Sequence, residues 1–191
     1  MKNITSTLRV LGSTTIVASD REQHEFYATE PKAVELLLEE EHFQQDILEP
    51  CCGLNHITNV LRDKGYRVHT SDLIDRGIGA EVKDFFDYTH WHGDIVTNPP
   101  YSQAVDFVEH SLKIVEEGSK VAMFLKIQFL EGKKRKEFFK YFPPKYIYVA
   151  SSRLRCAKNG EFDKYGSSAV CYAWFVWEKG FQGEPSVRWI N

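Results

Sequence analysis

Residues 46–72, with the sequence DILEPCCGLNHITNVLRDKGYRVHTSD, indicate the fold class of this chain. Asp46–Glu49 predicts a short strand, which a Pro-Cys-Cys-Gly turn follows. Residues 55–64 predict a helix, and Gly65 stands where glycine commonly ends a helix. Residues 66–70 predict a second strand, which stops at a Ser-Asp pair. A strand, a helix and another strand in succession are typical of an α/β domain.

The same alternation continues on both sides of this stretch. Pro31 opens a predicted helix in PKAVELLLEEEHF, because proline suits the first helical turn. Further elements are predicted as strands at 95–97, 121–125, 146–150 and 169–177, a helix at 103–115, and the end of a helix at 138–142. No repeat or flexible linker interrupts the pattern. The sequence therefore predicts a three-layer α/β fold with a mostly parallel sheet.

The last two predicted strands, 146–150 and 169–177, have no long helix between them, which predicts a C-terminal antiparallel hairpin. The second, AVCYAWFVW, is apolar on both alternating faces, as expected of a strand buried within a sheet. We expect one domain over residues 1–191 with no separate target-recognition domain. Residues 1–25 would form an N-terminal extension, with one short strand at 8–10 or 14–18.

The bulk composition restricts the class of protein. The chain has 191 residues, of which 42% are hydrophobic and 27% charged, as in an ordinary globular domain. A net charge of -3 excludes a polycation that coats nucleic acid, so any contact with nucleic acid needs a local basic patch. No apolar run approaches the roughly 20 residues of a membrane span. The N-terminus lacks the apolar core of a signal peptide, so we expect no membrane association and a cytoplasmic location.

Neither the cysteines nor the histidines predict a metal site. Two of the four cysteines are adjacent and no C-x-x-C pair occurs, which suits neither a disulfide framework nor zinc. His90-x-His92 followed by Asp94 contains residue types that can bind a metal, but no second cluster of ligands completes the site. We therefore expect solvated loop histidines and no metal. The four cysteines are Cys51, Cys52, Cys156 and Cys171.

Polar and glycine residues stand where several predicted strands end. In an open α/β sheet, ligands bind outside the carboxyl ends of the strands. The glycine turn after Glu49 allows close approach of a ligand, and Asp72 lies about 20 residues beyond it, as a ribose-binding carboxylate does. Asp84-Phe85-Phe86 adds an acceptor and a flat apolar surface suited to adenine. Taken singly, these residues can be an ordinary turn, a helix cap and core; their order favours a nucleotide-like cofactor.

Asn98-Pro99-Pro100-Tyr101 follows the predicted strand at 95–97. An exocyclic amine on a planar base or amide is a poor nucleophile, because its lone pair is delocalised. The Asn98 side-chain oxygen and the Pro99 carbonyl can accept hydrogen bonds from the N–H groups of this amine and so favour a pyramidal nitrogen. The prolines fix the backbone, and the Tyr101 ring can stack on a planar substrate. The alternative is that these four residues end a strand and cap the following helix.

In this order, the residues resemble the class I S-adenosylmethionine-dependent methyltransferases that carry the (D/N/S)PP(Y/F) motif. Within that class, the chain is similar to small phage-type DNA adenine-N6 methyltransferases, and the resemblance runs from about Phe26 to Trp177. It implies a Rossmann-like methyltransferase fold and S-adenosyl-L-methionine as cofactor. Residues 26–31 (FYATEP) resemble the F-x-T-P segment of the family, which Glu30 interrupts.

The glycine turn departs from the family motif at one position. Glu49-Pro50-Cys51-Cys52-Gly53-Leu54-Asn55 matches (D/E)-P-x-x-G-x-G except that Asn55 replaces the second glycine. Asparagine tolerates positive φ better than most residues, so we expect the turn to survive. The resemblance implies catalytic roles for Asn98, Pro99, Pro100 and Tyr101, and cofactor-binding roles for Tyr27, Thr29, Glu49, Pro50, Gly53, Asp72, Leu73, Asp84, Phe85 and Asn98.

The substrate that carries the amine stays open. Lys133–Lys136 is expected in a loop leading into a helix, and a second basic group, Arg153 to Lys164, in a loop between the last two strands. Either group can contact phosphates or only aid solubility. We expect DNA rather than RNA as the partner. The alternatives are an RNA base, a protein glutamine, or a catalytically idle partner subunit that binds the cofactor or nucleic acid. The sequence does not predict the oligomeric state.

Overall fold

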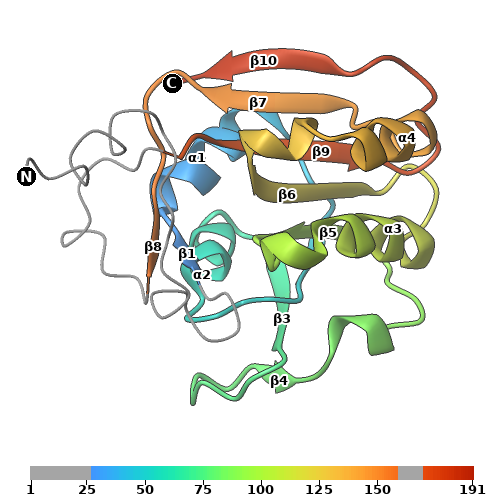
Figure 1. Ribbon diagram of the computed structural model, residues 1–191. Helices are drawn as coiled ribbons and strands as arrows, with labels where there is room; N and C mark the ends of the chain where they lie inside the picture. Colours follow the sequence, from blue (N-terminus) through green and yellow to red (C-terminus); the bar gives the residue numbers. More distant parts are fainter. Residues whose placement is uncertain (1–26, 159–169) are drawn as a thin grey trace, which may run out of the picture.

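A computed structural model describes residues 27–158 and 170–191, and Figure 1 shows a central sheet with helices packed against it. Phe26, the strand expected at 8–10 or 14–18, and part of the basic loop up to Lys164 lie outside the described residues. Within them, no helix has both the length and the apolar character needed to cross a bilayer.

The large sheet has eight strands in the order β10-β7-β9-β6-β5-β2-β3-β4, and β1 and β8 form a separate antiparallel pair. The strands are β1 Tyr27–Thr29, β2 Asp46–Glu49, β3 Arg67–Asp72, β4 Glu81–Val82, β5 Asp94–Thr97, β6 Lys120–Lys126, β7 Tyr146–Ala150, β8 Cys156–Lys158, β9 Tyr172–Glu178 and β10 Ser186–Ile190. The helices are α1 Pro31–Glu40, α2 His56–Asp63, α3 Ala104–Ile114 and α4 Lys133–Tyr141, with 3₁₀ turns η5 Phe85–Asp87, η6 Tyr101–Gln103 and η7 Ile127–Leu130.

The pairing confirms a mostly parallel sheet with an antiparallel hairpin. From β4 to β6 every neighbouring pair is parallel, while β9 runs antiparallel to both β6 and β7. The edge strand β10 was not expected, and it pairs parallel with β7. Four of its five residues are exposed, so it carries no alternating burial pattern that a sequence reading could detect.

Buried side chains form one cluster on each face of the sheet, which gives the expected three layers. One cluster contains Phe107 of α3 and Phe138 of α4, and the other contains Leu37 of α1 and Leu61 of α2. Alternate residues of β9 belong to the two clusters, and residues 172–177 are all buried. This confirms that the strand lies within the sheet.

The basic run Lys133–Lys136 lies inside α4, which corrects the expectation of a loop at this position. The helix follows Gly132 and has no acidic residue in its first turn. The run has no apolar periodicity, so the pattern could reveal only the later, apolar turn of this helix.

Candidate active site

A cleft opens where β2, β3 and β5 end, at the carboxyl edge of the parallel strands. Its empty volume is about 890 Å³, including the open space at its mouth. Most of the residues expected to bind cofactor or to take part in catalysis meet here. Those that line the cleft are Tyr27, Thr29, Glu49, Pro50, Asp72, Leu73, Asp84, Phe85, Asn98 and Pro100; Gly53, Pro99 and Tyr101 are not among the lining residues.

The glycine turn has the backbone that its motif requires. Gly53 has φ of 54°, and Asn55 has φ of 65° with ψ of 25°, which is the left-handed region. The expectation that Asn55 supports this turn is therefore confirmed. The Asn55 N–H donates to the carbonyl of Cys52 at 2.7 Å, which closes the turn directly before α2.

Asp72, at the end of β3, holds the glycine turn in place. Its Oδ2 accepts from the Gly53 N–H at 2.9 Å, and its Oδ1 accepts from the Ile74 N–H at 3.0 Å. The Asp72 side chain is 13% exposed, and the Arg76 Nε lies 3.7 Å from its Oδ2. A carboxylate has about four acceptor positions, so both oxygens keep capacity for ligand hydroxyls.

Glu49, at the end of β2, is a buried carboxyl group beside the cleft. The Thr58 hydroxyl donates to its Oε2. Burial raises the pKa of Glu49 to about 8, because the charged form loses its hydration and the hydrogen bond from Thr58 offsets only part of that loss. Near neutral pH, the protein alone therefore favours the protonated form, and a cation placed beside Glu49 would favour the charged form.

The segment from Asp84 forms an aromatic wall of the cleft. The Asp84 Oδ1 accepts from the Phe86 N–H at 3.0 Å and caps η5. Phe85 is only 3% exposed and stacks on Phe107 with ring centroids 4.7 Å apart, whereas Phe86 is 38% exposed. The more accessible ring of the expected apolar surface is thus Phe86, whereas the resemblance implied the cofactor-binding role for Phe85, which also lines the cleft.

Asn98, just after β5, is oriented by the small sheet, which is the two-stranded pair of β1 and β8. Its Nδ2 donates to the Tyr27 carbonyl at 3.0 Å and to the Thr29 Oγ1 at 2.9 Å, with the Cys156 sulfur at 3.7 Å. A backbone carbonyl can only accept, so the amide nitrogen must face β1 and Oδ1 must face away from it. The N-cap residues of η6 and α3 are Pro100 and Gln103, so Asn98 is not the N-cap of either helix.

Tyr101 lies among other aromatic side chains. Its ring centroid is 6.4 Å from that of Tyr27 and 6.0 Å from that of Tyr172, and the Lys126 ammonium lies 4.6 Å from its centroid. Its hydroxyl is 3.3 Å from the Cys156 sulfur, whose pKa burial raises to about 12, so this cysteine is a neutral thiol. A planar substrate that stacks on Tyr101 must therefore take the place of one of these neighbours.

Several further residues line the cleft that the sequence analysis did not assign to it. Their common signal is position, because each lies within a few residues of a strand end already singled out, or on a helix that begins beside one. They are Ala28, Cys51, Cys52, His56, Ile57, Ile74, Arg76, Gln103 and Phe107.

Comparison with known proteins supports the fold but not a family assignment. No protein-family model matches the chain, and no curated protein matches it significantly. Among solved structures, a protein of Listeria monocytogenes described as a class I S-adenosylmethionine-dependent methyltransferase aligns with a TM-score of 0.55 at 13% identity. The alignment covers 81% of this chain and 62% of that one, so this chain spans less than two thirds of its length.

Two other solved structures give similar alignments. An Agrobacterium tumefaciens protein described as a predicted O-methyltransferase has a TM-score of 0.55 at 13% identity, with 84% of this chain and 85% of that chain covered. The M protein of the type I restriction enzyme EcoKI has a TM-score of 0.54 at 15% identity, with 79% and 43% covered. The chain therefore has the Rossmann-like fold of these methyltransferases, as the sequence predicts.

Proposed function

We propose that this chain is an S-adenosyl-L-methionine-dependent methyltransferase that methylates the exocyclic N6 amine of adenine in DNA. The observation that carries the proposal is the orientation of the Asn98 amide. Its nitrogen is held by Tyr27 and Thr29, so its oxygen is turned away from the small sheet, and no described residue donates to that oxygen. An acceptor fixed in this way suits the N–H of a planar amine.

The cleft has suitable groups for each part of the cofactor. The adenine would lie against Phe86 and Phe85, with Asp84 as acceptor for its amine. The ribose hydroxyls would donate to Asp72, whose oxygens keep free acceptor capacity. The methionine ammonium would lie near Glu49, where its positive charge offsets the cost of ionising a buried carboxyl group.

In the proposed reaction, the lone pair of the adenine amine attacks the methyl carbon of the sulfonium. The new N–C bond forms as the C–S bond breaks, and S-adenosylhomocysteine leaves with the electron pair. The nitrogen then releases one proton to solvent. The two N–H groups of the amine would donate hydrogen bonds to Asn98 Oδ1 and the Pro99 carbonyl, which would stabilise the positive charge that develops on the nitrogen. Catalysis then rests on positioning and electrostatics.

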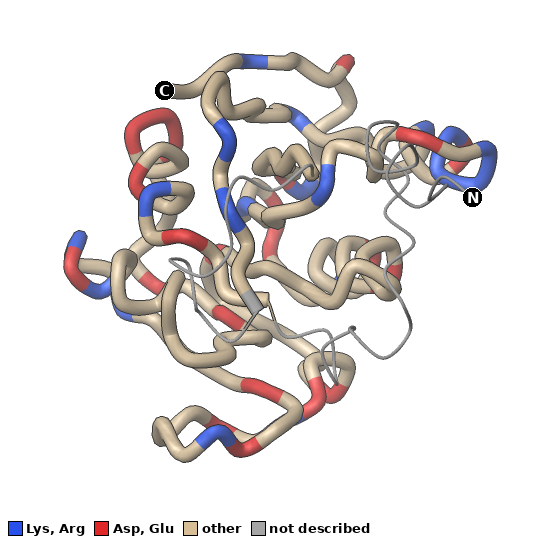
Figure 2. Tube along the Cα trace, turned by 60° about the vertical axis from the view of Figure 1, so that its left-hand side comes forward, with Lys and Arg blue, Asp and Glu red and all other residues tan. Residues whose placement is uncertain are grey.

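The first turn of α4 supports a polyanionic substrate. Lys133, Lys134 and Lys136 are exposed, and none pairs with an acidic group among the described residues. Figure 2 shows Lys and Arg positions gathered at the right-hand edge of the trace, where α4 lies. Cations at a helix N-terminus oppose the helix dipole at a cost of about 0.3–1 kcal/mol each. A phosphate backbone would offset that cost, which favours a binding role over solubility alone.

The position of α4 also suits a substrate at the cleft. Lys126, whose ammonium lies over Tyr101, precedes Lys133 by few enough residues that about 25 Å of chain at most can separate them. Several base pairs of a duplex span this distance. The similarity in fold to the M protein of a restriction enzyme is consistent with a DNA substrate.

The test is to incubate the chain with tritiated S-adenosylmethionine and DNA, RNA or total protein, and to locate the label. We expect N6-methyladenine in DNA, and we expect Asn98→Ala to lower kcat by about 10²–10³-fold. Cofactor binding by that variant is measured separately by calorimetry, and Asn59→Ala, an exposed change on α2, is the matched control.

Each alternative predicts a different result. Label only in RNA or protein would overturn the DNA substrate but keep the chemistry. Cofactor binding without transfer to any substrate would favour an idle partner subunit. Absence of cofactor binding would overturn the whole proposal.

A further inference from the structure

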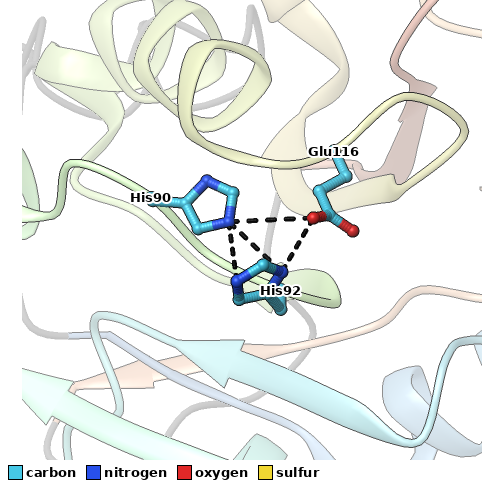
Figure 3. Close-up of side chains that lie close together, drawn as sticks. All are labelled: His90, His92 and Glu116. Carbon is cyan, nitrogen blue, oxygen red and sulfur yellow. Dashed lines mark hydrogen bonds and ion pairs between the residues drawn. The ribbon is translucent and has the colours of Figure 1, made fainter.

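Figure 3 shows His90, His92 and Glu116 with their polar atoms turned toward one another. One ligand atom from each lies within 4.8 Å of the other two. We propose that these three side chains form a binding site for a divalent first-row metal ion of the Zn²⁺ type. This site shares no residue with the cleft, so it does not depend on the proposed methyltransferase activity.

The backbone presents both histidines on one side of their loop. Trp91, between them, packs against the core, and its indole N–H donates to the Asp94 carbonyl at 3.0 Å. With the middle residue directed inward, the two flanking side chains extend outward, where half or more of each is exposed. The loop therefore holds two imidazoles together without needing either of them for packing.

A hydrogen bond between backbones brings the third ligand into reach. The Trp91 N–H donates to the carbonyl of Ile114, the last residue of α3, at 2.8 Å. Glu116 follows two residues later, in the connection from α3 to β6. Two loops that are distant in sequence are thus fixed against each other at the point where the ligands meet.

The distances between ligand atoms suit one metal ion. The His90 Nε2 lies 3.0 Å from the His92 Nε2 and 3.2 Å from its Nδ1, and the Glu116 Oε1 lies 2.7 Å from the His92 Nδ1 and 3.8 Å from the His90 Nε2. Bonds of about 2.0–2.1 Å to zinc place neighbouring ligand atoms roughly 2.9–3.4 Å apart. Small side-chain rotations of exposed groups bring all three atoms into this range.

The donor set selects the class of metal. Two imidazole nitrogens and one carboxylate oxygen suit Zn²⁺ and its neighbours, whereas Ca²⁺ and Mg²⁺ prefer oxygen ligands. Three protein ligands on an exposed surface leave coordination positions open for water. The site would join the loop that enters β5 to the connection that enters β6, so a bound ion would restrain the ends of two central strands.

The third group of this cluster differs from the one that the sequence suggested. The third candidate, Asp94, faces the interior, where its carboxylate accepts from the backbone N–H groups of Gln44 at 2.6 Å and Lys120 at 2.7 Å. The group that joins the two histidines is instead Glu116, which no local spacing indicates.

The test is to titrate Zn²⁺ into the full chain, without an affinity tag, by calorimetry, and to follow the melting temperature. We expect one ion per chain and a higher melting temperature with the metal. His92→Ala and Glu116→Gln should each weaken binding by roughly tenfold or more, because a lost ligand costs at least as much as a lost supporting group. Both are surface changes, so their melting temperatures without metal should match the original.

His69→Ala is the matched control. His69 and Glu81 form another exposed His–Glu pair, 2.8 Å apart, without a second histidine, so this variant should bind Zn²⁺ like the original chain. The free cysteines offer other places for the ion, and the variants locate it. Absence of binding up to millimolar Zn²⁺ would overturn the proposal, as would unchanged binding in both His92→Ala and Glu116→Gln.

Discussion

The Asn98 amide nitrogen lies 3.0 Å from the Tyr27 carbonyl oxygen, so the residue after β5 is held by β1. Among the described residues, β1 pairs with β8 and with no strand of the large sheet. The orientation of the central residue in the proposed chemistry therefore depends on a small sheet built from two distant segments.

The Thr29 hydroxyl is the second acceptor for this amide, so its removal should lower turnover. Thr29 is buried, and Thr29→Val keeps its shape while removing one hydrogen bond to Asn98. A net loss of about 1 kcal/mol in positioning corresponds to roughly a fivefold lower kcat. Thr29→Ser should retain most activity, and steady-state kinetics of both variants checks this. Equal kcat in Thr29→Val and the original chain would contradict the role.

Glu49 should make the unliganded protein less stable as pH rises. Its ordinary pKa of 4.5 is raised to about 8 in the fold, so folding favours the protonated form. The stability that protonation gives is full below about pH 4.5 and is lost as pH rises through 8, because the unfolded chain ionises at the lower pH. Urea denaturation at pH 5 and pH 8 measures the free energy of unfolding of Glu49→Gln and of the original chain. The difference in favour of Glu49→Gln should grow by on the order of a few kcal/mol from pH 5 to pH 8. Parallel pH dependence of the two proteins would count against a buried neutral Glu49.

Replacing Asn55 tests the left-handed turn. Glycine adopts this backbone without strain, and the Asn55 Oδ1 is buried with no hydrogen-bond partner among the described residues. Asn55→Gly should therefore change the free energy of unfolding by less than about 1 kcal/mol, while Asn55→Ala should lower it by about 1–2 kcal/mol. Denaturant unfolding of both variants measures the difference, and a more stable alanine variant would be the contrary result.

The lysines of α4 should set the salt dependence of DNA binding. Changing Lys133, Lys134 and Lys136 to Gln should reduce the slope of log affinity against log salt by about 0.9 for each phosphate that a lysine no longer neutralises. Stability should stay equal or rise, since the cations oppose the helix dipole. Fluorescence anisotropy at several salt concentrations checks this. Lys64→Gln with Lys113→Gln, exposed changes at the ends of α2 and α3, is the control, and an equal effect there would point to nonspecific attraction.

The sequence predicts what local pattern determines. Asp46–Glu49 and Tyr146–Ala150 were expected with these bounds, because strand periodicity and strong turn residues mark them. The strand-end rule also brought Glu49, Asp72 and Asn98 to one cleft. In these cases residues close together in the sequence determine the feature, so the sequence alone predicts it.

Long-range contacts could not be predicted in this way. β1 and β8 are three residues each and pair across more than a hundred residues, so neither has a periodicity of its own. The approach of Glu116 to His92 and the contacts of the Asn98 amide depend likewise on how the chain packs. The resemblance implied the cofactor-binding role for Phe85 alone, and the two adjacent aromatic residues do not reveal which ring is buried.

Because the small sheet is separate from the large one, its local opening can be distinguished from global unfolding. Both strands lie outside the ladder of the eight-stranded sheet, and of their described residues only the partly buried Cys156 packs against its two clusters of buried side chains. Local opening of that pair releases the Asn98 amide at a lower free energy than global unfolding. Amide hydrogen exchange in β1 therefore measures the fraction of folded molecules that are ready for chemistry, a quantity that a melting temperature does not report.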